Sequence, residues 1–83
     1  MDPLVNSYSS GRQGAYDLNN LTESGTYFCT NGSTNKPASV GGGLLVIKGL
    51  TNSIQFMIDY NEKVWIRNYQ EVSGIWSTWK ALN

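Results

Sequence analysis

The 83-residue sequence contains no histidine, and Cys29 is its single cysteine. Without histidine, a hydroxyl or thiol nucleophile lacks its commonest general base, although lysine and carboxylates can take that role. A zinc-type site needs histidines or several thiols, and one cysteine cannot form a disulfide within the chain. We therefore expect no metal and no other cofactor, and we interpret Cys29 as a small apolar residue of a strand.

The six carboxylates are the candidate groups for a paired-acid mechanism. A glycosidase needs two of them held a fixed distance apart across a cleft. However, Asp17 is placed to cap a helical turn, and Glu62 lies in a predicted turn. Residues 41–43 are three glycines without the Gly-Lys-Ser/Thr that follows in a phosphate-binding loop. We predict no catalytic residues and no enzyme; a glycan-cleaving module is the minor alternative.

Charged residues are scarce, at 14% of the chain, and six basic residues balance six acidic ones. Such a chain has no long-range field to attract nucleic acid or an anionic membrane. Its first residues lack the basic start and apolar run of a signal peptide, and no stretch approaches the roughly 20 apolar residues that span a bilayer. We expect a soluble chain made in a cytoplasm, with no nucleic-acid partner and no membrane insertion.

Aromatic residues make up 12% of the chain and include three tryptophans. Together with abundant glycine, asparagine, serine and threonine, they are typical of a tightly turned β domain with a neutral polar surface. A single domain of this length buries only a small core. Because neither a disulfide nor a metal is expected to stabilise the domain, self-association is the remaining common way to stabilise so small a core.

Most of the segments that the sequence predicts are β-strands. Residues 1–16 show no periodicity and are predicted to be an extended N-terminal arm, and residues 17–22 suffice for one helical turn. The β-prone segments, rich in β-branched and aromatic residues, are 26–30, 44–48, 53–60, 63–69 and 75–80. The sequence predicts an all-β fold for residues 17–83: a small antiparallel sheet, as a meander or sandwich, with the arm and at most one helical turn.

The faces of the sheet follow from its turns. A two-residue hairpin loop at residues 61–62 places Ile58 opposite Trp65, and a turn at residues 51–52 extends the sheet to the preceding strand. One face then collects an apolar set interrupted by Arg67: Leu45, Ile47, Ile54, Phe56, Ile58, Trp65 and Tyr69. The other face collects a second apolar set: Val46, Met57, Val64 and Ile66. Polar residues ring this second set: Lys48, Gln55, Asp59 and Asn68.

A chain this short can cover one of two apolar faces. The first face is expected to pack as the core, with a structural aromatic set formed by Tyr27, Phe56, Trp76 and Trp79. The second face, with Val46, Met57, Val64 and Ile66, is the candidate oligomer interface, buried against further copies of the chain as a homotrimer or against another protein.

Aromatic rings also suggest a carbohydrate site. Exposed rings stack on the apolar faces of sugars, and neighbouring amide or guanidinium groups bind the hydroxyls. The candidate glycan-binding residues are Asn35, Trp65, Arg67 and Tyr69. The polar loop of residues 31–39 is either a ligand loop or a plain connection. A monomeric lectin-like carbohydrate-binding module is thus the alternative to a self-associating one.

Several short motifs occur in a characteristic order. Asp-Leu-Asn at 17–19, Gly-Thr-Tyr at 25–27 and Asn-Lys-Pro at 35–37 precede a closing Gly-x-Trp-Ser-x-Trp-Lys at 74–80. Together, over about residues 15–83, they resemble the pyocin knob domain of phage and R-type pyocin tail fibres. The bulky residues just before the closing motif depart from the glycine- and asparagine-rich turn expected there.

The resemblance implies a small β domain strung along a homotrimeric fibre. Such a fibre carries a phage tail or pyocin to the bacterial surface, so the implied function is a structural and adhesive module of a receptor-binding tail protein. The implied partners are further copies of the chain, the rest of the tail fibre or baseplate, and bacterial surface glycan. The implied location is the virion, after synthesis in the host cytoplasm, with residues 1–16 continuing from the fibre shaft.

Overall fold

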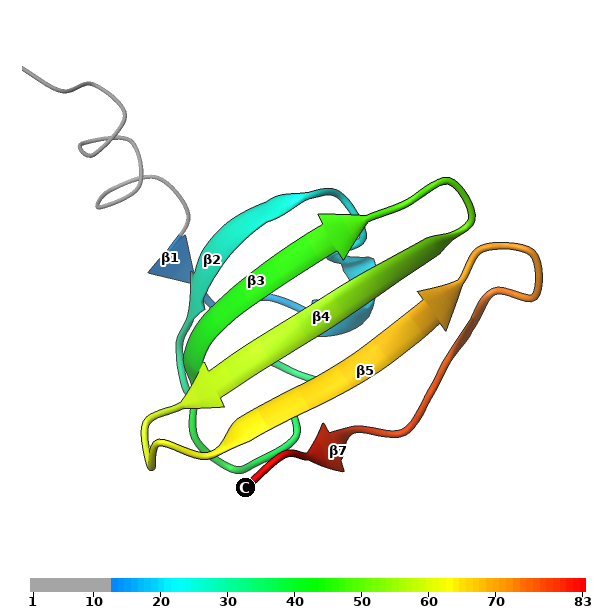
Figure 1. Ribbon diagram of the computed structural model, residues 1–83. Helices are drawn as coiled ribbons and strands as arrows, with labels where there is room; N and C mark the ends of the chain where they lie inside the picture. Colours follow the sequence, from blue (N-terminus) through cyan, green and yellow to red (C-terminus); the bar gives the residue numbers. More distant parts are fainter. Residues whose placement is uncertain (1–12) are drawn as a thin grey trace, which may run out of the picture.

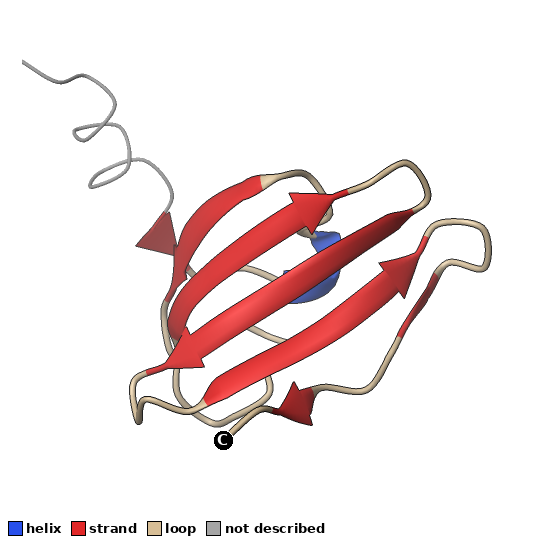
Figure 2. Cartoon of the chain, viewed as in Figure 1, coloured by secondary structure: helices blue, strands red, loops and turns tan. Residues whose placement is uncertain are grey.

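The computed structural model describes residues 13–83. They form one twisted sheet of seven strands, with a single 3-10 turn behind it (Figures 1 and 2). In chain order the elements are β1 (Gln13–Gly14), η1 (Leu18–Asn20), β2 (Gly25–Cys29), β3 (Gly42–Lys48), β4 (Asn52–Asp59), β5 (Val64–Gln70), β6 (Ile75–Trp76) and β7 (Lys80–Ala81). The predicted all-β fold with one helical turn is confirmed.

Strands β2 to β5 form an antiparallel meander at the centre of the sheet. β1 adds to β2 in parallel, while β6 and β7 both pair with β5. The long connection between β2 and β3 contains the predicted polar loop and returns behind the sheet (Figure 1). Because β6 and β7 both pair with β5, the closing tryptophan motif lies along β5.

The start of the described chain is tied to the sheet. β1 belongs to the predicted N-terminal arm, yet it pairs with β2, and the ring of Tyr16 meets that of Tyr27 edge-on at 5.4 Å between centroids. The Asp17 carboxylate then accepts the Asn19 N–H at 3.0 Å and caps η1, as the sequence indicates. The rest of the predicted arm, residues 1–12, lies outside the described residues.

The hairpin between β4 and β5 differs from the predicted one. Ile58 pairs with Val64 rather than with Trp65. The turn is wider because the Asp59 carboxylate accepts the backbone N–H groups of Asn61 and Lys63, at 2.8 and 3.1 Å. The predicted two-residue loop is therefore wrong. A register change of one residue moves every side chain of β5 to the other face of the sheet.

The core lies between the sheet and the segment that carries η1. Its buried apolar side chains come from four elements: Leu18, Cys29, Leu44, Val46 and Met57. Half-buried side chains pack around them: Tyr16, Leu21, Tyr27, Trp65 and Trp79. Val46 and Met57 are only 1% and 0% exposed. Their assignment to an oligomer interface is wrong, because Leu18 and its neighbours cover this side, the inner face.

The opposite side of the sheet is called the outward face. From β2 to β5 it carries an apolar set with polar residues at one end: Thr26, Phe28, Gly43, Leu45, Ile47, Asn52, Ile54, Phe56, Ile58, Val64, Ile66, Asn68 and Gln70. Phe56 therefore does not belong to the predicted aromatic core, whereas Tyr27, Trp76 and Trp79 are half-buried on the inner side. Val64 and Ile66 lie on the outward face, so the four predicted interface residues are not brought together.

Candidate functional site

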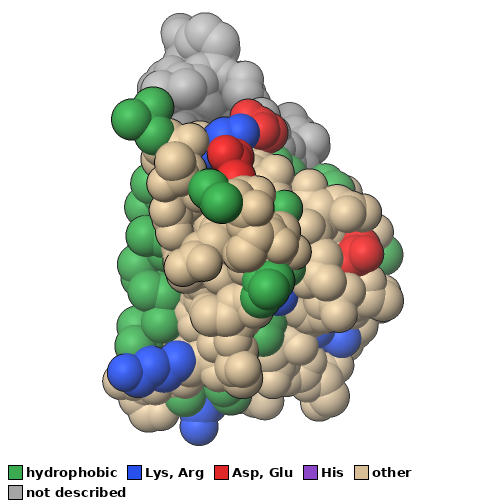
Figure 3. Space-filling view, turned by 90° about the vertical axis from the view of Figure 1, so that its right-hand side faces the viewer, with side chains coloured by type: hydrophobic (Ala, Val, Ile, Leu, Met, Phe, Trp, Pro, Cys, Tyr) green, Lys and Arg blue, Asp and Glu red, His purple; other side chains and the backbone are tan. Residues whose placement is uncertain are grey.

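The outward face is a continuous apolar surface. Its most exposed large side chains are Ile58, Ile47, Phe28 and Leu45, with 57%, 47%, 46% and 41% of their area accessible. No segment between residues 13 and 83 crosses it, and hydrophobic side chains line the left margin of Figure 3, where the sheet is seen from the side. Among the described residues of β2 to β5, none that faces outward is charged. A surface of this kind is typical of an interface.

The strand register arranges these side chains in rows. Phe28, Gly43, Ile58 and Val64 form one row across the four central strands. The next row is Thr26, Leu45, Phe56 and Ile66, and the third contains Ile47, Ile54 and Asn68. Sequence reasoning treated the aliphatic residues of β3 and β4 as core, and it did not consider Phe28 and Gly43. Because β3 carries apolar residues on both sides, its sequence gave no signal that would have identified the exposed face.

A shallow hollow opens in the first row, where Gly43 has no side chain. It has a volume of about 280 Å³. Its walls come from β2, β3 and β4 and are almost entirely apolar: Thr26, Tyr27, Gly43, Leu44, Leu45, Phe56 and Ile58. The hollow is suited to an apolar group rather than to a sugar or an ion.

On the inner side, Arg67 is held between aromatic rings. Its guanidinium lies 3.9 Å from the centre of the Trp76 ring and 4.5 Å from that of Trp79, and Tyr69 packs on Trp76 at 4.9 Å. The Arg67 Nε donates to Gln55 Oε1 at 2.8 Å. Arg67 is 6% exposed, and this burial lowers its pKa to about 10. The guanidinium is therefore part of the packing that ties β6 and the closing motif to β5.

The other predicted glycan residues are also engaged within the chain. The Asn35 amide donates to the Asp17 carboxylate at 2.7 Å, and the Asn35 carbonyl accepts the Trp79 indole N–H at 3.0 Å. The Trp65 indole N–H is bound separately, by Asp59 at 3.0 Å. The structure thus gathers Asn35, Arg67 and Tyr69 around the two closing tryptophans. Their role in binding glycan stays a prediction.

The Asp59 carboxylate organises the β4–β5 turn. Besides two backbone N–H groups it accepts the Trp65 indole N–H, although only 5% of Asp59 is exposed. The hydrogen bond from Trp65 lowers the pKa of Asp59 below its ordinary value of 3.8, outweighing the effect of burial, which raises it. The ionised form of Asp59 therefore stabilises the fold.

This pKa shift predicts a defined acid sensitivity. Because the folded-state pKa is the lower one, the contribution of Asp59 is fully present above pH 3.8 and is lost as the pH falls through the folded-state value. Asp59→Asn should lower the urea midpoint of unfolding near pH 7, and the difference from the unmodified protein should shrink near pH 2. Glu62→Gln, in the same turn, is the control. A difference of constant size across this range would contradict the assignment.

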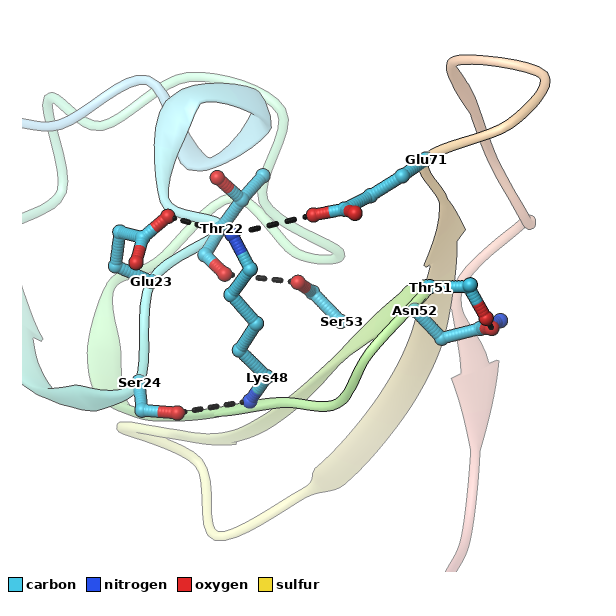
Figure 4. A network of polar contacts seen from close by, with 8 residues as sticks. All are labelled: Thr22, Glu23, Ser24, Lys48, Thr51, Asn52, Ser53 and Glu71. Atoms are coloured by element: carbon cyan, nitrogen blue, oxygen red, sulfur yellow. Dashed lines mark hydrogen bonds and ion pairs between the residues drawn. The ribbon is translucent and has the colours of Figure 1, made fainter.

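A second network of polar contacts lies at the end of the sheet opposite the β4–β5 turn (Figure 4). The Lys48 ammonium lies 2.9 Å from Glu23 and 3.2 Å from Glu71, and these hydrogen bonds raise its pKa. Nearby, the Ser53 hydroxyl donates to the Thr22 carbonyl at 2.8 Å. The Lys48 contacts are solvent-accessible and so contribute little to stability. Their role is to fix the chain before β2 and the β5–β6 turn to the ends of the central strands.

Comparison with known proteins gives no relative. The chain matches no family model, no curated protein and no solved structure. Within residues 13–83, no helix has the length and apolar character needed to cross a membrane. In the same residues, no three histidine, cysteine, aspartate or glutamate side chains are grouped as metal ligands would be. The outward face is thus the feature of the described chain that most needs a functional explanation.

Proposed function

We propose that this chain is a non-enzymatic structural and adhesive module of a phage or phage-like tail fibre, which assembles with itself as a homotrimer and contributes to attachment at the host cell surface. One observation carries the proposal: the apolar outward face of β2 to β5, which no segment of residues 13–83 covers. The resemblance of the Asp17–Asn19 and 74–80 motifs to the pyocin knob domain supplies the biological setting.

The composition of the face favours a second copy of the chain as its partner. The outward-facing residues of β2 to β5 carry no charge, so two such surfaces in contact do not repel each other and do not select a charged partner. Lys80 of β7, which pairs with Ile66, lies at the edge of the face. Ile, Leu, Val and Phe side chains dominate it, as they do the interfaces of stable homo-oligomers. Each copy supplies the same apolar side chains to the assembly.

The size of the face favours more than two copies. Four strands about 4.8 Å apart, over about six residues each, outline roughly 400 Å². Two such faces in contact would bury roughly 800 Å² in total, which is small for a stable dimer. A homotrimer in which the sheet edges also took part would bury more area per copy, and we therefore propose the homotrimer rather than a face-to-face pair.

The test is the mass of the assembled protein in solution. At micromolar concentration the chain should sediment as a trimer of its 9.2 kDa protomer. Ile58→Asp places a charge on the outward face between Gly43 and Val64, where 57% of the residue is accessible and no core contact is lost. This variant should be a folded monomer, because an unpaired charge buried between copies costs several kcal/mol.

A matched control separates this effect from a general effect of charge. Val72 is 91% exposed in the turn after β5, away from the outward face, so Val72→Asp should remain trimeric. A monomeric unmodified protein would reject the assembly proposal and favour the alternative, a monomeric lectin-like module. Equal masses for Ile58→Asp and the unmodified trimer would show that the interface lies elsewhere.

A further inference from the structure

Three consecutive glycines precede or begin β3, and the fold explains two of them. A Cβ atom at Gly41 would collide with the Cys29 carbonyl oxygen, and one at Gly42 would collide with the Ile58 carbonyl oxygen. Both are backbone atoms of neighbouring strands or their continuations, so they cannot move aside. Only glycine fits at these two positions.

Gly43 has no such explanation. A Cβ atom there would meet nothing within 4 Å in the described part of the chain. Gly43 is the second residue of β3 and is paired on both sides, with Phe28 and with Ile58, and the glycines with positive φ are Gly25 and Gly74. A glycine in a strand lowers stability, because it loses more conformational entropy on folding and packs no side chain. Nothing in residues 13–83 accounts for the space that Gly43 leaves.

The space at Gly43 is the floor of the apolar hollow on the outward face. Phe28 and Ile58 stand on either side of it on the neighbouring strands. Its volume of about 280 Å³ exceeds the roughly 150 Å³ of a cavity that holds benzene. The hollow is therefore large enough for one aromatic or branched aliphatic side chain arriving from outside.

We propose that the hollow at Gly43 receives Ile47 from a second copy of the chain, an inference that rests on the proposed self-assembly. Ile47 is on the same strand and face, 47% exposed, and about 13 Å from the hollow at about 3.3 Å per residue. The other exposed apolar residues of the face are already in use. Leu45 and Ile58 form walls of the hollow, and Phe28 packs on Tyr60.

A surface that carries both a protruding side chain and its receptor can join identical copies without any change in sequence. With the two features on one strand, the hollow of each copy is filled by the next copy around a closed ring. The pair also fixes how far one sheet slides along another, which a uniformly aliphatic face would leave undefined. Gly43 and Ile47 are thus predicted to set the register of the assembly.

Gly43→Val fills the hollow and tests this pairing. The variant should fold as well as the unmodified chain, because valine favours strands and has free space at this position. Its association should weaken about tenfold or more, since overpacking by added methyl groups is penalised at a close contact. Sedimentation equilibrium measures the association, and far-ultraviolet circular dichroism confirms the fold.

Three further variants make the result decisive. Gly49→Ala adds a Cβ that meets only the Asn52 carbonyl oxygen at 3.6 Å, so it should assemble normally. Ile47→Ala should weaken association, and its effect should not add to that of Gly43→Val, because each removes the same contact. If Gly43→Val does not fold, Gly43→Ala carries the same test with a smaller effect.

The outcomes separate this inference from the proposed function. If Gly43→Val associates as tightly as the unmodified chain, or if the effects of Gly43→Val and Ile47→Ala are additive, the pairing is wrong and the proposed assembly stands. If the unmodified chain is a monomer, the assembly itself is rejected and the pairing with it. Weakened association of a folded Gly43→Val together with non-additivity supports the inference.

Discussion

Met57→Asp should leave the protomer unfolded. Met57 is 0% exposed, in contact with the core residues of η1, β2 and β3. An unpaired carboxylate in this environment costs several kcal/mol. That is comparable with the whole stability of a small domain, which is about 5 kcal/mol. Circular dichroism and tryptophan fluorescence at 25 °C should both show the loss of structure, whereas Ile58→Asp, one residue further along β4, should retain it.

Met57→Leu is the matched control for this prediction. It keeps the apolar character and approximate volume of the side chain, so it should lower the free energy of unfolding by less than about 1.5 kcal/mol. A Met57→Asp protein that stays folded and loses only its self-association would show that Met57 lies on an exposed face that forms the interface. The assignment of the two faces of the sheet would then be reversed.

The local features of the fold could be predicted from the sequence. Runs of β-branched and aromatic residues mark the central strands, and Asp17 followed by Leu18 and Asn19 marks the capped turn η1. Each of these signals depends on residues close together in the chain. The structure confirms them because short-range hydrogen bonds and backbone preferences decide them.

The assignment of the two faces could not be predicted in this way. β3 and β4 carry apolar residues on both sides, so the alternation does not show which side is buried. The answer depends on Leu18, which packs from another segment, and on the side chain of Asp59, which widens the following turn by its hydrogen bonds. Both are long-range or side-chain effects that a hairpin rule omits.

The polar residues of the inner face were hidden for the same reason. The sequence predicts that Gln55 lies at the polar rim of the second face, the candidate oligomer interface. In the structure Gln55 is 0% exposed. Its amide nitrogen donates to the carbonyls of Leu18 and Leu21, at 2.8 and 2.9 Å, and its oxygen accepts from Arg67. These partners lie more than thirty residues away or on the next strand. A buried glutamine side chain is tolerated only where its polar atoms have hydrogen-bond partners.

Gln55→Met should therefore lower the free energy of unfolding by about 3 kcal/mol or more. Methionine fills a similar volume but makes none of the three hydrogen bonds of Gln55. The Leu18 and Leu21 carbonyls and the Arg67 Nε are then left without these partners, at about 1–3 kcal/mol for each buried group. Urea unfolding, followed by circular dichroism, measures the loss. The Ile58→Asp background keeps dissociation from contributing to it.

A double-mutant cycle with Arg67→Met identifies the cause of that loss. Arg67→Met alone leaves the Gln55 oxygen unpaired and removes the guanidinium from between Trp76 and Trp79. In the double variant neither partner of the Gln55–Arg67 hydrogen bond remains, so its loss should be smaller than the sum of the single losses by about 1–2 kcal/mol. Strictly additive losses would mean that Gln55 stabilises the fold through η1 alone. Because Gln55 joins η1 to Arg67, and Arg67 joins β5 to the closing tryptophans, a non-additive result would show that this buried chain of contacts holds the inner face together.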